Sequence, residues 1–240
     1  MKEKLKSYAY SVKRFFGLFG YLGLKGFAKT IVFNFKYLPF HQAINLPILM
    51  SGKVKFGYMK KGAIVLVGGG KRGTLRIGLQ DRQYCYDKPS FFNIYGKLIL
   101  KGNGIHSFAP GAQVYVGGDA ILSIDEGFTV SHDLKIYCKY KITFGKNNMW
   151  SYYNIVMDND GHHIYDQEMN HINKNKEILF GDDVWLGGRC TVQKGSVIPR
   201  GCVIGSDSLV RKKLETECAV YAGDGPQLIK QNIVWDRKLV

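Results

Sequence analysis

The stretch EILFGDDVWLGGRCTVQKGSVIPRGCVIGSDSLV, Glu177 to Val210, decides the fold. A large apolar residue recurs at every sixth position, at Phe180, Leu186, Val192, Ile198, Ile204 and Val210. Two residues before each of these stands a small or apolar residue, at Ile178, Val184, Cys190, Ser196, Cys202 and Ser208. A period of six is not a multiple of the 3.6-residue helical turn, but it is a multiple of the two-residue strand period. The pattern therefore predicts short strands that point both marked positions inward.

The breaks between these strands show how the chain turns. Glycine directly follows the large residue at Gly181, Gly187 and Gly205, and Pro199 takes the same place. Three such strands close one triangular coil, and stacked coils place Phe180 under Ile198, Leu186 under Ile204 and Val192 under Val210. One repeat cannot bury its apolar face alone, so the stacking supplies the core. The predicted fold class is all-β, a parallel β-helix of hexapeptide repeats.

The same register continues upstream in a looser form. Its members there are Ile124, Val130 and Ile136, then Phe144, Trp150 and Val156 after an eight-residue step, with Ile77 as an earlier member. The region 50–115 is too irregular for its register to be set. The polar stretch Asp158 to Lys176 interrupts the repeat, and we expect a loop that leaves one corner of the solenoid. Loops on rigid scaffolds are where function concentrates.

Composition limits the classes of partner. The net charge of +15 favours anionic partners, namely nucleic acid, a phospholipid surface or a polyphosphorylated small molecule. We find no motif for reading nucleic acid and expect no nucleic-acid partner. The five cysteines, Cys85, Cys138, Cys190, Cys202 and Cys218, are odd in number and not closely paired. This argues against a disulfide framework or a CxxC zinc site and favours reduced, buried thiols.

Residues 1–48 form a basic and aromatic segment that we expect to be helical. The longest apolar run, Phe15 to Leu24, is ten residues and contains three glycines, whereas a bilayer span needs about 20. Two interpretations stay open: residues 1–40 lie on an anionic membrane surface, or they cap the open end of the solenoid. The start lacks the apolar core and cleavage site of a signal peptide. We therefore expect a cytoplasmic protein, with a peripheral place on the inner face of the bacterial plasma membrane if the first interpretation holds.

The run Val184 to Lys212 resembles the C-terminal half of hexapeptide-repeat acyltransferases of the galactoside and maltose acetyltransferase type. Ala222-Gly223 and Leu228-Ile229-Lys230 are similar to the exit segment of that family. The run FNFKYLPFHQAINLPI, Phe33 to Ile48, and a DxDxH loop extend the resemblance to capsular and surface polysaccharide O-acetyltransferases. The resemblance implies a left-handed β-helix, a homotrimer with active sites between subunits, acetyl-CoA as acyl donor, no metal, and a saccharide or lipid-linked saccharide acceptor. The chain is thus expected to divide into three parts. These are the N-terminal helical segment 1–48, a β-helix at 49–222 with the catalytic loop 158–176, and an exit segment at 223–240.

Acetyl transfer to a hydroxyl needs a base for the alcohol proton and hydrogen-bond donors for the developing oxyanion. A neutral imidazole suits the base, since its ordinary pKa lies near 6.5. His162 and His163 stand in the inserted loop, and the DxDxH resemblance gives His162 the base position. Asp158 or Asp160 would orient the ring through its other nitrogen. The alternative is a polar loop whose histidines are merely solvated.

On the donor side, the resemblance places the acyl-donor arm along a coil edge, where glycine lets the pantetheine approach the backbone. Amide N–H groups there would meet the thioester oxygen. The matching positions are Gly187, Gly188 and Ser206 beside the pantetheine, and Arg211, Lys212 and Lys230 toward the nucleotide phosphates. The sequence departs from the family at Asp224-Gly225-Pro226, where Asn-Pro-Ala is usual, and at Gln227, where a basic residue is usual.

Two aromatic residues are candidates for contact with the acceptor. Trp185 precedes an inward position, so it should point outward, either to stack on a sugar or to pack between subunits. Tyr165 lies in the inserted loop beside the histidines.

Two rival functions use the same fold. A γ-class carbonic anhydrase would need three zinc-binding histidines from neighbouring coils, whereas His162, His163 and His171 lie in one loop at other spacings. A non-enzymatic β-helix, serving as a scaffold or a membrane-docked binding module, would have no affinity for CoA. The expected activity is transfer of an acetyl group from acetyl-CoA to a sugar hydroxyl in surface polysaccharide biosynthesis.

Overall fold

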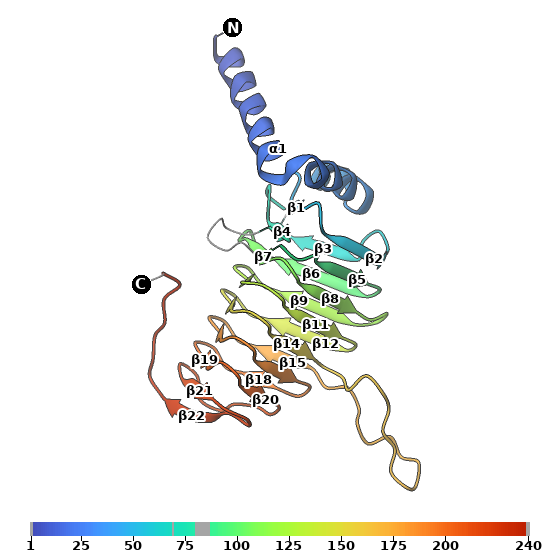
Figure 1. Cartoon of the computed structure of the whole chain (residues 1–240), viewed down its shortest axis with the longest axis vertical. Coiled ribbons are helices and arrows are strands. Elements are labelled where there is room, and N and C mark those ends of the chain that lie inside the picture. Colours follow the sequence, from blue (N-terminus) through green and yellow to red (C-terminus); the bar gives the residue numbers. More distant parts are fainter. Residues whose placement is uncertain (1, 69, 80–86, 239–240) are drawn as a thin grey trace.

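The computed structural model describes residues 2–68, 70–79 and 87–238. Three parallel sheets wind around one axis as a left-handed β-helix (Figure 1). From β1 to β20 the strands follow one another through the three sheets in turn, so every third strand is a neighbour in the same sheet. The all-β hexapeptide fold predicted from the repeat is therefore confirmed.

The first sheet contains β1 (Ile48–Met50), β4 (Leu75–Ile77), β7 (His106–Phe108), β10 (Thr129–Val130), β13 (Met149–Trp150), β16 (Trp185–Leu186), β19 (Val203–Ile204), β21 (Val220–Ala222) and β22 (Gln227–Lys230). The second contains β2 (Lys55–Met59), β5 (Phe91–Ile94), β8 (Gln113–Val116), β11 (Lys135–Cys138), β14 (Ile155–Met157), β17 (Thr191–Gln193) and β20 (Leu209–Val210). The third contains β3 (Ile64–Val67), β6 (Lys97–Lys101), β9 (Ile121–Ile124), β12 (Lys141–Phe144), β15 (Ile178–Phe180) and β18 (Val197–Ile198).

The register agrees with the predicted stacking. Phe180 pairs with Ile198, Leu186 with Ile204, and Val192 with Val210. Ile77 is also a member, because β4 pairs with β1 on one side and with β7 on the other. The region 50–115, whose register the sequence left open, contains the strands from β2 to β8.

The core is an aromatic column inside the prism. The column consists of the rings of Phe92, Phe108, Phe128, Phe144 and Phe180, one after another down the axis. From Phe56, which contacts Phe92, to Phe180, the centroids of successive rings lie 4.7–6.1 Å apart. Trp150 packs against the lower rings and is fully buried. Four cysteines lie in the described part of the chain as free thiols, three of them buried, while Cys85 lies outside it. Burial raises the pKa of Cys138, Cys190 and Cys202, so these thiols stay protonated.

Helix α1 (Lys2–Tyr37) caps one end of the solenoid. It bends at Gly23, whose φ of 66° is left-handed; the first half points away from the body, and the second half lies across the first coil (Figure 1). Asn34 donates to the carbonyl of Ile48 (2.7 Å) and accepts from its N–H (3.1 Å), and Thr30 Oγ1 accepts from Met50 N–H (3.1 Å). The helix therefore satisfies the open edge of β1, as the cap interpretation requires.

The remaining segments frame the site. A short helix, α2 (Phe40–Ala43), links the cap to β1. Within the described residues, no helix is long and apolar enough to cross a bilayer. At the other end β22 turns back antiparallel on β21, and the chain then runs along the corner between the third and first sheets (Figure 1). Arg237 fixes this tail by donating to Gly127 O (2.6 Å) and Thr129 Oγ1 (2.9 Å).

Candidate active site

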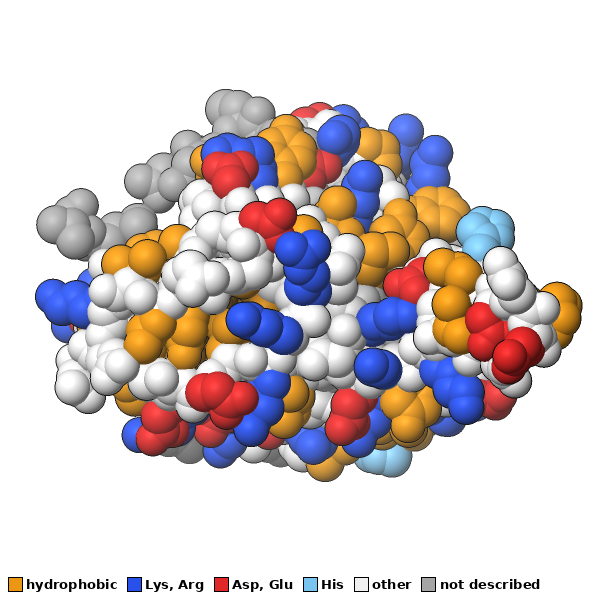
Figure 2. Space-filling model, turned by 90° about the horizontal axis from the view of Figure 1, so that it is seen from below, with side chains coloured by type: hydrophobic (Ala, Val, Ile, Leu, Met, Phe, Trp, Pro, Cys, Tyr) orange, Lys and Arg blue, Asp and Glu red, His pale blue; other side chains and the backbone are white. Residues whose placement is uncertain are grey.

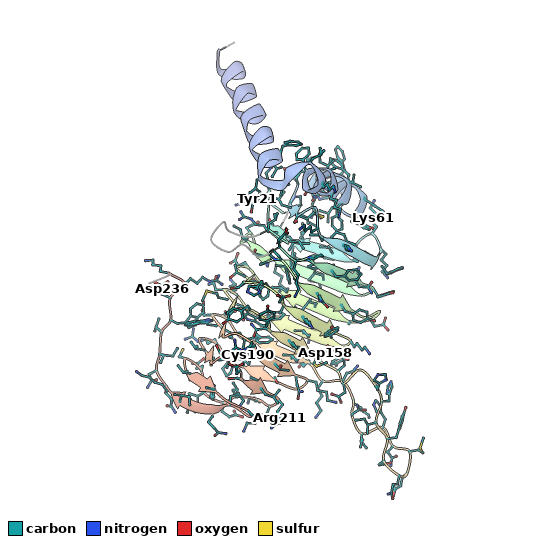
Figure 3. All side chains as sticks on the ribbon, in the orientation of Figure 1. Tyr21, Lys61, Asp158, Cys190, Arg211 and Asp236 are labelled. Atoms are coloured by element: carbon teal, nitrogen blue, oxygen red, sulfur yellow. The ribbon has the colours of Figure 1, made fainter. Side chains whose placement is uncertain are left out.

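The inserted segment between β14 and β15 projects from the corner between the second and third sheets (Figure 1). Asp158 lies at its root and is fully buried (Figure 3). Its two carboxylate oxygens accept the backbone N–H groups of Lys139 and Tyr140, each at 2.8 Å. A third donor, Asn159 Nδ2, lies 3.0 Å away. Asp158 therefore joins the loop to the coil above it, and its oxygens face backbone amides rather than an imidazole.

The outer part of the loop is a narrow hairpin. Ile172 N–H donates to Ile164 O (3.0 Å), and Tyr165 bridges to His171 across the arm. At the tip, Asp166 accepts the N–H groups of Glu168 and Asn170, which also lower the pKa of its carboxyl. The loop is thus a braced arm, although it lacks a hydrophobic core of its own.

Asn173 is the centre of this bracing. Its Nδ2 donates to Asp160 Oδ2 and to the carbonyl of His162, both at 2.9 Å. Its Oδ1 accepts from Ile164 N–H (2.7 Å) and lies 2.9 Å from His171 Nε2. The role of Asn173 was not predicted from the sequence, because an asparagine in a polar loop is not marked by any spacing pattern.

The candidate bases line a small cavity at the base of the arm. The cavity has a volume of about 280 Å³, and both His162 and His163 are among its lining residues. Asp160 also lines the cavity and pairs with Lys194, which lowers the pKa of the carboxyl. His163 Nδ1 lies 3.1 Å from His171 Nε2, so its ring already has a partner in the arm. His162 is exposed at the cavity wall, and its backbone, rather than its ring, is held by Asn173.

The predicted donor-side residues next to the pantetheine do come together. Gly187 and Gly188 follow β16, Ser206 follows β19, and all three lie at the corner between the first and second sheets. A Cβ on Gly187 would stand 2.6 Å from Ser206 N, and one on Gly188 would stand 3.0 Å from the Tyr152 ring. Coil stacking therefore requires glycine at position 187, where a Cβ would meet backbone, whereas at position 188 the Tyr152 ring would have to move.

The amides of these glycines are already bonded. Gly187 N–H donates to Ile204 O (2.8 Å), and Gly188 N–H donates to Ser206 Oγ (3.2 Å). The Ser206 hydroxyl accepts here, which leaves its own O–H to donate, and the residue is exposed. At this corner the Ser206 hydroxyl can therefore still donate a hydrogen bond, whereas the N–H of each glycine is already used.

Tyr152 and His132 enlarge this corner and were not expected from the sequence. The Tyr152 ring, which touches the Gly188 position, is stacked on His132 with centroids 5.3 Å apart and planes 10° apart. Asp133 Oδ2 lies 3.2 Å from His132 Nδ1. Burial, and then the charge of Lys88, lowers the pKa of His132, which favours the neutral ring at pH 7.

The predicted phosphate-side residues come from two different sheets. Arg211 and Lys212 follow β20 at the far end of the second sheet, whereas Lys230 is on β22 at the edge of the first (Figure 3). Arg211 donates to Asp224 Oδ1 (2.8 Å), so the acid that departs from the family pattern holds the guanidinium. Lys212 and Lys230 are exposed.

Trp185 points outward, as predicted, and 38% of its surface is exposed. The indole of Trp235 from the C-terminal tail lies beside it, with ring centroids 5.9 Å apart. Trp235 Nε1 donates to Asp183 O (2.7 Å), which fixes the tail at this point. Trp185 therefore has a partner in its own chain that the sequence did not indicate, and its exposed part faces solvent.

The two half-sites lie on different corners of one chain. The loop leaves the corner between the second and third sheets. Trp185, in contrast, lies in the first sheet, and Gly188 and Ser206 lie at the corner between the first and second sheets. The arm projects away from the body, on the side opposite to β19 and β21 in Figure 1. Across the described ranges, no cluster of three His, Cys, Asp or Glu side chains is arranged to hold a metal ion.

The chain was compared with known protein families, sequences and structures. No protein-family model matches the chain. The polysialic acid O-acetyltransferase of Neisseria meningitidis is 34% identical over 154 residues, 61% of this chain and 72% of that protein. The enzyme of the same description from Escherichia coli O1:K1 is 34% identical over 148 residues, 61% of this chain. The match spans only 45% of the Escherichia coli protein, less than half its length.

A solved structure shares the fold. It is the polySia specific acetyltransferase NeuO, with 20% sequence identity and a TM-score of 0.51, covering 80% of this chain and 90% of that one. The identity to the Neisseria meningitidis enzyme, together with the shared β-helix fold, leads to one assignment. The chain belongs to the family of polysialic acid O-acetyltransferases, within the hexapeptide-repeat acyltransferases.

Proposed function

We propose that this protein transfers an acetyl group from acetyl-CoA to a hydroxyl of a surface polysaccharide, with His162 as the general base. The observation that carries the proposal is the cavity at the base of the arm, which His162 lines without a ring partner inside the arm. The family membership supports the reaction class, and an acidic glycan is the favoured acceptor because the matched relatives are described as polysialic acid enzymes. Acetyl-CoA is a cytoplasmic metabolite, so the cytoplasm is the proposed site of action.

The reaction needs one proton shuttle and no covalent enzyme intermediate. The His162 imidazole takes the proton of the acceptor hydroxyl as its oxygen attacks the thioester carbonyl. The Ser206 hydroxyl donates to the oxyanion that forms. The carbon–sulfur bond then breaks, and the imidazolium returns the proton to the departing CoA sulfur. Asp160, held by Lys194 and Asn173, lines the same cavity as His162 and would contribute negative charge there.

The positions of the half-sites favour a homotrimer with shared sites. The arm carries His162 away from its own body, so the Trp185 and Ser206 side of a site would come from a neighbouring copy. Cyclic assemblies pair two different patches of one chain in this way. In such an assembly Trp185 borders the acceptor, and Tyr165 on the arm lies close to the same region.

The test is a comparison of the two neighbouring histidines. In a thiol-release assay with acetyl-CoA and an acidic polysaccharide, His162→Ala should lower turnover by roughly 10²–10⁴-fold, the usual contribution of a general base. His163→Ala, which removes a ring that bonds within the arm, should cost far less. Normal turnover in His162→Ala together with an inactive His163→Ala would refute the assignment. A non-enzymatic scaffold would be indicated if the wild-type chain failed to bind immobilised CoA.

Mixed trimers test the shared site. His162→Ala and Trp185→Ala subunits, co-expressed in equal amounts, should recover about a quarter of the wild-type sites, because half the arms and half the faces are intact. Each variant expressed alone should show its own low activity. If the site lay within one chain, mixing would recover no sites, and the mixed sample would show only the mean of the two variants.

A further inference from the structure

The positive charge of the protein is concentrated at the capped end. Residues 4–80 contain 14 lysines and arginines and no acidic residue, so they carry +14 of the net +15. In the described part of the chain they form α1, α2 and the strands β1 to β4. The opposite end of the solenoid is different, because basic and acidic side chains are interspersed over it (Figure 2). The molecule is therefore strongly polarised along its axis.

The same end exposes apolar side chains that the solenoid does not use. In the second half of α1 the buried positions, among them Phe27, Thr30, Phe33 and Asn34, face the first coil. The opposite side carries an exposed stripe at helical spacing, which continues onto α2 through contact between the Phe35 and Phe40 rings (6.0 Å). We call this the cap stripe: Leu24, Val32, Phe35, Phe40 and Ile44, with exposed fractions from 47% to 73%.

An apolar groove with lysines along its lining lies beside the cap stripe and includes Val32. The groove has a volume of about 650 Å³, with Phe33, Phe56 and Phe91 on its walls and Lys29, Lys36 and Lys55 among its lining residues. Lys29 Nζ donates to the carbonyls of Gly52 and Val54, and Lys36 lies 5.1 Å from the Tyr37 ring centre. Apolar side chains flanked by lysines match the boundary between acyl chains and anionic headgroups.

We infer that the capped end docks on an anionic phospholipid surface. A second copy of the chain is a poor occupant, since two faces of this charge would repel each other. A polyanionic glycan would satisfy the lysines but would leave the cap stripe in water. A phospholipid surface can bind both the lysines and the apolar cap stripe. Each basic residue near an anionic leaflet strengthens binding about fivefold, and each buried methylene strengthens it about fourfold. The helix contributes affinity in the plane of the bilayer and does not cross it.

The test is flotation of the full chain with vesicles at about 0.1 M salt. Binding is expected to phosphatidylcholine vesicles that contain about 30% phosphatidylglycerol and to be at least tenfold weaker without it. Raising the salt to about 1 M shortens the screening length from about 10 Å to about 3 Å and should weaken binding by a similar factor. This arm uses only the wild-type protein, so its result does not depend on how any variant folds.

The variant arm removes the apolar contribution without changing charge. Leu24→Gln/Val32→Gln/Phe40→Gln should lower the partition coefficient by about 10- to 100-fold. The matched control, Ile229→Gln/Val234→Gln, replaces exposed apolar side chains far from the cap and should bind as the wild type does. Circular dichroism and sedimentation velocity without vesicles check fold and assembly. No binding to anionic vesicles, or equal binding by the triple variant, would overturn the inference. A changed oligomeric state in the triple variant would instead assign the stripe to contact between copies.

Discussion

Replacing Asp158 tests whether this carboxylate supports the loop or serves the reaction directly. Asp158 is fully buried and accepts two backbone N–H groups at 2.8 Å and the Asn159 amide at 3.0 Å. Hydrogen bonds to a charged group contribute about 1.5–3 kcal/mol each, and a buried donor left without a partner costs about 1–3 kcal/mol. Counting mainly the two backbone donors, we expect Asp158→Ala to lower the free energy of unfolding by about 3–5 kcal/mol.

Asp158→Asn provides the graded comparison. It keeps one acceptor oxygen but places an NH₂ group against a backbone N–H, so it should cost about 2–3 kcal/mol. Urea unfolding at fixed protein concentration, followed by circular dichroism, measures both values. Turnover in each variant should fall only as far as the arm loses order. A loss below 1 kcal/mol in Asp158→Ala, combined with a large fall in turnover, would refute the structural role and restore Asp158 as the residue that orients the histidine.

Three further predictions concern the site. Gly188→Ala should lower the free energy of unfolding by about 1–3 kcal/mol, because the new methyl group meets the Tyr152 ring at 3.0 Å; a thermal shift would detect this, and an unchanged transition would contradict the contact. Lys194→Met removes the partner that lowers the pKa of Asp160, so that pKa should rise toward its ordinary value. Since a depressed carboxyl pKa gives stability that is lost as pH falls through the folded-state value, the variant arm should lose hydrogen-exchange protection at a higher pH than the wild type. Trp235→Ala should raise the exposure of Trp185, and acrylamide should then quench its fluorescence more strongly; unchanged quenching would show that the two indoles are not in contact.

The repeat from Phe180 to Val210 predicted its strands and their stacking because each six-residue unit there has the same length. Upstream, the units differ in length. In the paired register, the inward residues Phe92 and Leu100 are eight positions apart, and Val114 and Ile124 are ten apart. Ile124 and Val130, in contrast, are six apart. A fixed six-residue register cannot follow such changes, although β3 to β8 have the same inward alternation. The regular repeat therefore predicted the stacked architecture. The region 50–115 could not be given a register, because the lengths of its turns at the corners vary.

The site was predictable only where residue type implied chemistry. An imidazole in an inserted polar loop marks a candidate base, and glycines beside a repeat position mark a close approach. The bracing by Asn173 and the burial of Asp158 depend on contacts across 11 to 19 positions of the chain, which no local pattern encodes. The pairing of Trp185 with Trp235 depends on a tail that returns along the solenoid, and nothing in the tail sequence specifies that path.

The stacked coils also set a height. From β2 beside the cap to β14, where the arm begins, the second sheet has four strand steps of about 4.8 Å, roughly 19 Å in all. A helix lying across the end adds about 10 Å. With its cap on a bilayer, the protein would hold its acceptor cavity about 30 Å above the lipid headgroups. A glycan still joined to a membrane lipid would then be modified only after it had grown long enough to span that height, so the number of coils beneath the arm would set a minimum length for the acceptor.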